Sequence, residues 1–114
     1  MKIEGKAKAL AVYMGESDHW QSRPLYVAIV ERARELGMAG ATVTRGIMGF
    51  GANSRIHTTT ILRLSEDLPV VVQIVDMPER IDPFLKELDA MVTEGMVVTW
   101  DVTVEQYRSS KANA

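Results

Sequence analysis

The segment from residue 46 to residue 58, GIMGFGANSRIHT, holds the residues whose types and spacing best fit ligand chemistry. Three glycines, Gly46, Gly49 and Gly51, allow backbone N–H groups to approach an anion closely. Arginines and neutral donors surround them: Arg45, Arg55, Arg63, Asn53 and Ser54. The same glycines also suit a long hairpin that only needs residues with positive φ. The segment therefore indicates either a phosphate or anion site or a flexible connection, and both interpretations stay open.

Other motifs in the sequence argue against several kinds of site. The glycines follow a predicted strand, but no helix opens directly after them and no Gly-Lys-Ser/Thr is present, which excludes dinucleotide-binding and P-loop mechanics. His19 lies near Glu16 and Asp18 in a sequence typical of a turn, and His57 has no carboxylate close in sequence, so no metal site is predicted. A Ser54–His57 pair lacks a visible third member. We therefore predict no catalytic residue.

Composition and charge set the broad class of the protein. The 114 residues (12.7 kDa) are 46% hydrophobic and 25% charged, which is typical of one globular domain. A net charge of −2 and a pI of about 5.7 give no global attraction for nucleic acid or an anionic membrane. The sequence has no cysteine, no apolar leader and no apolar run of membrane-spanning length. We expect a cytoplasmic protein that binds no nucleic acid and does not insert into membranes.

Hydrophobic patterns predict the elements that must position the glycine-rich segment. Strands are expected at 7–14, 41–48, 69–76 and 96–107, and 60–64 is ambiguous between strand and helix, with strand favoured. A first helix is expected to begin at Pro24 and to end before Gly37. A second helix carries an apolar stripe and ends before Gly95; its stripe comprises Ile81, Phe84, Leu85, Leu88, Met91 and Val92.

The order β-α-β, loop, β-α-β predicts an α+β fold, the ferredoxin-like βαββαβ sandwich. It has one four-stranded antiparallel sheet with both helices on one face. The predicted strands are apolar on one side and small or partly apolar on the other, as in Ala9, Ala11 and Tyr13. A sheet with one wet face would alternate apolar with clearly polar residues. The second face is therefore expected to pack on another copy of the chain, with Trp100 in the core or at the interface.

The segments RGIMGFGANSRIHT and ILRLSEDLPVVVQIVD, with MKIEGKAKALAVYMGESD before them and LDAMVTEGMV after them, make the chain resemble a known family. This family is domain of unknown function 190, a branch of the PII-like signalling protein superfamily. The resemblance runs from about Ile3 to Val104 and implies a homotrimer whose sheets face one another around the three-fold axis. It also implies a sensor, not an enzyme. Better-known PII-like members bind adenine nucleotides between subunits and present a long loop to a transporter or enzyme.

The resemblance also implies where the ligand and the partner bind. It divides the chain into a single domain, 1–114, with a core at about 3–105, a loop at about 49–65 and a polar tail at 108–114. The Glu94-Gly95-Met96 turn corresponds to the loop that receives phosphates in PII proteins. The nucleotide-binding residues it implies are Arg45, Gly46, Gly49, Phe50, Gly51, Ser54, His57, Arg63 and Gly95. Ala52, Asn53, Arg55 and Ile56 begin the loop that would dock on the partner.

Departures from the PII pattern narrow the expected ligand. No tyrosine lies between 27 and 106 to correspond to the modified loop tyrosine, and the glycine- and lysine-rich phosphate loop is reduced to EGMV. AMP or ADP is therefore expected as the effector in preference to ATP, and no cofactor is required. Family members are often encoded beside fluoride-exporting channels, which suggests a membrane transporter or channel as partner. The alternatives are an oligomeric module that docks without a small ligand and a small enzyme that uses His57.

Overall fold

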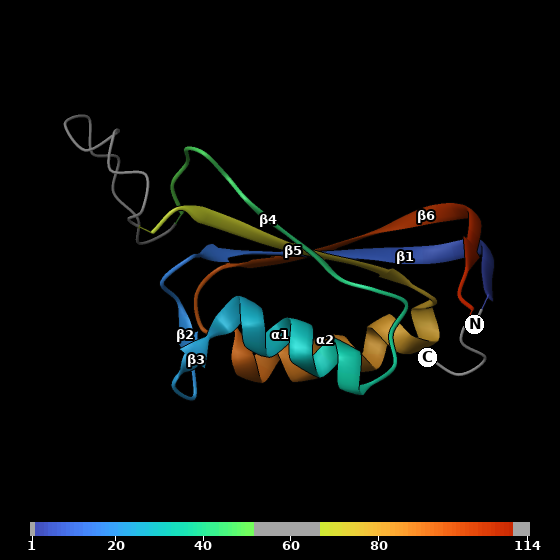
Figure 1. Ribbon diagram of the computed structural model, residues 1–114, viewed down its shortest axis with the longest axis horizontal. Coiled ribbons are helices and arrows are strands. Elements are labelled where there is room, and N and C mark those ends of the chain that lie inside the picture. Colours follow the sequence, from blue (N-terminus) through green and yellow to red (C-terminus); the bar gives the residue numbers. More distant parts are fainter. Residues whose placement is uncertain (1, 52–66, 111–114) are drawn as a thin grey trace.

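The computed structural model describes residues 2–51 and 67–110 (Figure 1). The possible strand at 60–64 lies outside these residues. None of the described helices is long and apolar enough to cross a membrane. The elements are β1 (Lys2–Gly15), β2 (His19–Trp20), β3 (Arg23–Pro24), α1 (Leu25–Glu35), β4 (Thr42–Arg45), β5 (Pro69–Asp76), α2 (Pro78–Met91) and β6 (Met96–Arg108).

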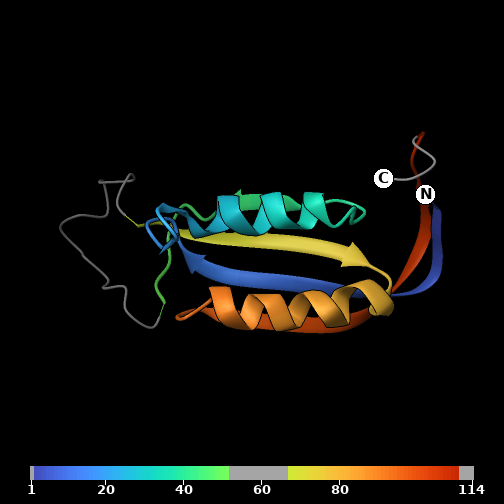
Figure 2. The same ribbon diagram turned by 90° about the horizontal axis from the view of Figure 1, so that it is seen from below.

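The four long strands form one antiparallel sheet in the order β4-β5-β1-β6. Both helices lie side by side on one face of it (Figures 1 and 2). This order and the one-sided helix layer confirm the predicted ferredoxin-like sandwich. The β1 strand is longer than predicted because Lys2 to Lys6 pair with the end of β6 across a bulge at Ile3/Gly5.

The core lies between the sheet and the helices. From β1, the side chains of Leu10, Val12 and Met14 are buried against the helix layer. From the helices, the predicted apolar stripes meet them, with Ile29 and Phe84 at 0% and 1% exposure. Side chains repeat on one face every two residues in a strand and every 3.6 residues in a helix, so the apolar residues of both kinds of element face the same core.

The predicted C-terminal end of α1 is confirmed, and its N-terminal end differs from the prediction by one residue. Gly37 has φ +70°, its N–H donates to the Arg34 carbonyl, and the Met38 N–H donates to the Ala33 carbonyl. This pattern is a Schellman C-cap, as the glycine predicted. Pro24 is the N-cap residue and not the first helical residue, because it pairs with His19 in the short β2–β3 hairpin.

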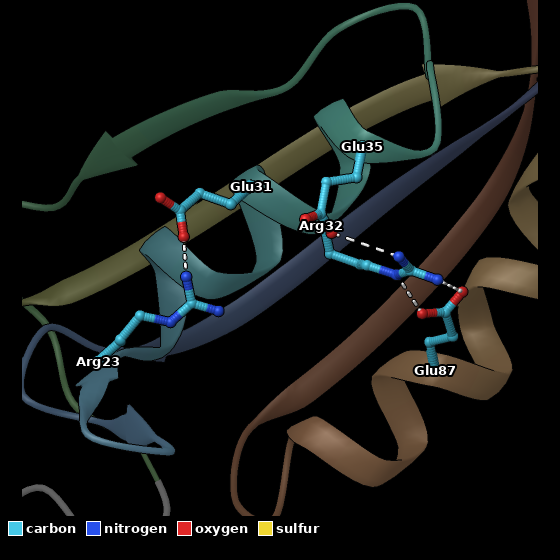
Figure 3. A network of polar contacts seen from close by, with 5 residues as sticks. All are labelled: Arg23, Glu31, Arg32, Glu35 and Glu87. Atoms are coloured by element: carbon cyan, nitrogen blue, oxygen red, sulfur yellow. Dashed lines mark hydrogen bonds and ion pairs between the residues drawn. The ribbon is translucent and has the colours of Figure 1, made fainter.

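An ion-pair network joins the outer surfaces of the two helices (Figure 3). The Arg32 guanidinium donates to both Glu87 carboxylate oxygens, from Nε at 2.5 Å and from Nη2 at 3.4 Å, and to Glu35 on its own helix. These hydrogen bonds, first of all those to Glu87, raise the pKa of Arg32 above its ordinary value. Arg23 pairs separately with Glu31. The network links α1 to α2 at the surface.

Asp76, at the end of β5, is fully buried and holds the α1–β4 connection. Its Oδ2 accepts a hydrogen bond from the Ala39 N–H at 2.9 Å, and its Oδ1 accepts one from the Met77 N–H at 2.7 Å. Arg80 lies 3.6 Å from the same carboxylate and donates to the Gly37 carbonyl. The Tyr107 hydroxyl donates to the Ala39 carbonyl at 2.8 Å. Side chains of β5, α2 and β6 thus satisfy the backbone of one loop.

Strand alternation and register show which side chains lie on the sheet face opposite the helices. None of these side chains is charged within the ranges Ala7–Tyr13, Thr42–Thr44, Pro69–Val75 and Met96–Val102. We call this face the open face. Ala9 and Ala11 are buried there between larger neighbours, while Tyr13 and Trp100 are each 44% exposed. The open face is therefore uncharged: it is small and apolar over β1 and β6, as the sequence predicted, and polar at Gln73, Thr42 and Thr44 toward β4.

Candidate functional site

A cavity of about 330 Å³ lies at the end of the sheet where β1 ends and β5 and β6 begin. In Figure 1 this is the end of the sheet away from the N and C labels. Three connections meet there: the turn after β1, the chain leaving β4 and the turn between α2 and β6. The lining residues are Tyr13, Met14, Gly15, Asp18, Phe50, Gly51, Asp67, Pro69, Glu94, Gly95 and Met96.

Hydrogen bonds between turns far apart in sequence hold one wall of the cavity. The Gly15 N–H donates to the Asp18 carboxylate at 3.0 Å, which closes the turn after β1. The Ser17 N–H and hydroxyl both donate to Oδ1 of Asp67, at 3.1 and 2.8 Å. The Glu16 N–H donates to the Leu68 carbonyl. Asp67, at φ +40°, thereby ties the chain entering β5 to the end of β1.

Gly46 and Gly49 are needed for close packing of the chain leaving β4. A Cβ at Gly46 would lie 2.7 Å from Cγ of Pro69, and one at Gly49 would lie 2.9 Å from the same atom. The Gly46 N–H also donates to the Pro69 carbonyl at 2.7 Å. These two glycines therefore bring the backbone against Pro69, and from there Phe50 and Gly51 reach the cavity.

Gly95 forms the tight turn that leads into β6. Its φ of +139° belongs to a region that residues with a side chain rarely adopt, and a Cβ would lie 2.5 Å from the Tyr13 carbonyl oxygen. The turn therefore places Glu94 and Met96 on either side of a residue that must be glycine.

Replacing Gly95 with alanine is expected to destabilise the protein by about 2 kcal/mol, since it combines backbone strain with a clash against backbone. Gly40→Ala is the matched control, because nothing lies within 4 Å of a Cβ there and its φ is not positive. It should change stability by less than about 0.5 kcal/mol. Urea denaturation at equal protein concentration measures both. Equal effects of the two variants would contradict the role given to Gly95.

Arg45 does not line the cavity, because its guanidinium is paired with Glu16. Nη2 and Nε of Arg45 donate to Oε2 of Glu16 at 2.6 and 3.1 Å. Oε1 of Glu16 is buried and accepts no hydrogen bond from any described residue. This pair links the end of β4 to the turn after β1, and so supports the cavity from outside.

The described lining of the cavity is acidic. Asp18, Asp67 and Glu94 contribute carboxylates, and no lysine or arginine is among the described residues that line it. Glu94 is exposed and makes no hydrogen bond or ion pair with the described part of the chain. Tyr13, Phe50 and Met96 add apolar surface. The described lining thus combines apolar surface with three carboxylates.

The structure brings together only part of the predicted nucleotide site. Phe50, Gly51 and Gly95 line the cavity, whereas Arg45, Gly46 and Gly49 lie beside it. Ser54, His57 and Arg63 fall outside the described residues, as do Ala52, Asn53, Arg55 and Ile56 of the predicted docking loop. Sequence reasoning did not select Tyr13, Asp18 or Asp67. Asp18 and Asp67 stand in GESD and SEDLP, which the sequence marks only as turns.

His19 is exposed, and its Nδ1 lies 2.5 Å from the Ser17 carbonyl oxygen. Over residues 2–51 and 67–110 no group of three or more histidine and acidic side chains is arranged to hold a metal ion. His57, the other histidine considered for a metal or catalytic role, lies outside the described residues.

The fold is similar to that of solved PII-like proteins. The solved structure of CPII from Thiomonas intermedia K12, a nitrogen regulatory PII-like protein bound to ADP, AMP and bicarbonate, superposes with a TM-score of 0.65. The alignment covers 91% of both chains at 14% identity. A likeness at this identity shows the fold.

Sequence comparison identifies the family. Residues 7–104 match the model of the DUF190 family, described as "Uncharacterized ACR, COG1993", and the chain belongs to this family. A UPF0166 protein of Aquifex aeolicus is 37% identical over 99 residues, covering 87% of this chain and 93% of the relative. The UPF0166 protein MJ1524 of Methanocaldococcus jannaschii is 34% identical over 100 residues, covering 87% and 92%.

Proposed function

We propose that this protein is a PII-like regulator, a cytoplasmic homotrimer that binds an adenine nucleotide, AMP or ADP, in clefts between its protomers. One observation carries the proposal: the cavity lies at the base of the segment that follows β4, between Phe50 and Gly51 on one side and the Gly95 turn on the other. A ligand there contacts the start of that segment directly. It can therefore control which surface the segment presents to a second protein.

A structural neighbour that was solved with adenine nucleotides supports an adenine nucleotide as the ligand. CPII, which shares the fold, has been solved with ADP, AMP and bicarbonate. The cavity described above, at about 330 Å³, falls in the size range of small-molecule sites. AMP and ADP therefore remain the first effectors to test, and a membrane transporter or channel remains the class of partner that the family resemblance suggests.

The open face supports the homotrimer. β1 and β6 present only apolar side chains on it, with Tyr13 and Trp100 each 44% exposed, and the described chain supplies no second layer to cover it. Large exposed apolar surfaces on soluble proteins mark interaction sites. Tyr13 belongs both to this face and to the cavity lining, so a copy packed on the open face lies next to the ligand.

The proposed mechanism is a shift between conformations of the segment that follows Gly51. A ligand that binds one conformation more tightly than another increases the population of the first conformation. The size of this shift is limited by the difference between the two affinities. Phe50 is 67% exposed, and apolar contact with a bound base would bury it. Ligand binding would thereby change the contacts of Phe50, close to the point where the partner-facing segment begins.

Isothermal titration calorimetry of the purified chain with AMP, ADP and ATP tests the proposal. We expect saturable binding of at least AMP or ADP. Because a ligand at 100 times its Kd stabilises the folded state by about 2.7 kcal/mol, the melting temperature should also rise by several degrees. Absence of heat together with an unchanged melting temperature at millimolar nucleotide would contradict the proposal.

A second function, docking on another protein without a small ligand, is favoured by the exposed side chains after β4. Ile47, Met48 and Phe50 are 86%, 70% and 67% exposed, which is unusual for three large apolar residues so close together. Arg45→Ala and Gly49→Val variants separate the two functions. Partner binding that both variants retain, with no response to nucleotide in the wild type, would favour the docking module.

A further inference from the structure

The turn at residues 15–18, with the sequence GESD, is fixed internally and joined to the start of α1. Gly15 leaves room for the Asp67 carboxylate, because a Cβ at Gly15 would overlap with it. The Asp18 carboxylate accepts a hydrogen bond from the Gly15 N–H at 3.0 Å. The Asp18 carbonyl accepts one from the N–H of Leu25, the first residue of α1, at 2.8 Å. The turn therefore has a defined position relative to the helix layer.

This turn holds the chain that enters β5. The Glu16 N–H donates to the Leu68 carbonyl at 2.8 Å. The Ser17 N–H and hydroxyl both donate to Oδ1 of Asp67, at 3.1 and 2.8 Å. Asp67 has φ +40°, a left-handed conformation that residues with a side chain adopt uncommonly. Because these hydrogen bonds stabilise that conformation, the entry to β5 depends on the turn.

The same turn holds the chain that leaves β4, through the Glu16 side chain. Nε and Nη2 of Arg45 both donate to Oε2 of Glu16, whose side chain is only 22% exposed. A partly buried ion pair is screened less by salt than one at the open surface. The chain after Arg45 carries Phe50 and Gly51 to the cavity. Glu16 therefore contacts one side of the cavity with its side chain and the other with its backbone.

We propose that the turn at residues 15–18 couples the chain leaving β4 to the chain entering β5, with Glu16 as the link, so that loosening one side of the cavity loosens the other. Interactions that share one hydrogen-bond and ion-pair network are non-additive, and coupling between two equilibria is reciprocal. The inference does not depend on the ligand of the proposed function. It gives that function a route by which a contact at Phe50 affects the conformation at Asp67.

Amide hydrogen exchange followed by NMR, without nucleotide, tests the coupling from the β4 side. Arg45→Ala removes the group that the Glu16 carboxylate binds. It should raise the exchange rates of the Glu16 and Ser17 N–H groups, which donate to the chain entering β5, about five- to ten-fold. Arg45→Lys is the conservative variant, because both Arg45 nitrogens donate to a single oxygen that an ammonium can also reach. It should keep both rates within about two-fold of the wild type.

The reciprocal measurement perturbs the β5 side and observes the β4 side. Asp67→Ala removes the acceptor of both Ser17 hydrogen bonds. It should raise the exchange rate of the Arg45 Nε–H, which donates to Glu16, by about the same factor as in the first measurement. Asp67→Asn keeps a carbonyl oxygen as acceptor and tolerates positive φ, so it should raise this rate by no more than about two-fold.

Two controls separate local coupling from general destabilisation. The Ala39 N–H donates to Asp76 at the other end of β5 and is the internal reference, whose rate should stay within about two-fold of the wild type in every variant. Asp82→Ala is the matched variant, because it breaks an exposed ion pair between α2 and Lys8 of β1. It should leave the rates in the turn within about two-fold of the wild type.

Three results would overturn the inference. The first is unchanged exchange at the Glu16 and Ser17 N–H groups in Arg45→Ala. The second is an equal effect of Arg45→Lys and Arg45→Ala, since the ion pair would then not be the link. The third is an equal rise at the Ala39 N–H, which would indicate a loss of global stability. None of these measurements contains nucleotide, so the calorimetric titration tests the proposed function separately.

Discussion

Replacing Asp76 with alanine is expected to lower the free energy of unfolding by about 3 kcal/mol, the cost of breaking a buried charged network. Asp76 is fully buried, and its carboxylate accepts hydrogen bonds from the Ala39 and Met77 N–H groups beside Arg80. Alanine would leave two N–H groups unsatisfied. The α1–β4 connection would lose the side chain that holds its backbone to the end of β5.

Urea denaturation followed by circular dichroism, at one protein concentration for all variants, measures this loss. Asp82→Ala is the matched control, since Asp82 lies six residues further on, in α2, but its side chain is 57% exposed and forms an ion pair with Lys8 at the surface. An exposed pair of this kind contributes at most about 1 kcal/mol. Losses of the same size in the two variants would show that the buried network does not carry the stability assigned to it.

The fold was largely predictable because its main elements bury one face each. The stripe that includes Phe84 and Leu88 has the period of a helix, and the glycine at 37 provides the left-handed residue that a Schellman cap requires. Local signals of this kind need no knowledge of the partner element. They were sufficient for the ferredoxin-like order of strands and helices.

The β2–β3 hairpin was missed because its turn uses no glycine. Gln21 and Ser22 have φ values of +50° and +68°, in a turn where asparagine or glycine would be expected. The two strands have two residues each, too few for a period to be seen. Pro24 was consequently placed one position too far into the helix.

The cavity was only partly predictable because its walls come from turns distant in sequence. Ser17 and Asp67 are joined by two hydrogen bonds across fifty positions, and nothing in GESD or SEDLP indicates that these turns meet. Gly95 was identified from the family resemblance. Arg45 was predicted to bind the nucleotide, and its pairing with Glu16 within one chain shows why a cation near a site need not line it.

The largest expected effect on assembly is that of Trp100→Asp, which should convert the proposed trimer into monomers. Trp100 lies on the edge strand β6, opposite Ala9 of β1 on the open face, and is 44% exposed in the single protomer. If a second copy covers this face, an aspartate there is a buried, unpaired charge in each of three interfaces. Burial of an uncompensated charge costs several kcal/mol, so three such sites exceed what a small apolar interface supplies.

Light scattering coupled to size exclusion should give three times the 12.7 kDa chain mass for the wild type and a single chain mass for Trp100→Asp. Thr99→Asp is the control, because Thr99 is the preceding residue on the same strand and points to the opposite side, where it pairs with Leu10. It should remain a trimer. Since Tyr13 joins the open face to the cavity, the monomeric variant should also bind AMP at least ten-fold more weakly. A trimeric Trp100→Asp protein, or a wild type that is a monomer, would remove the open face as the interface, and the ligand would then have to be held by one protomer alone.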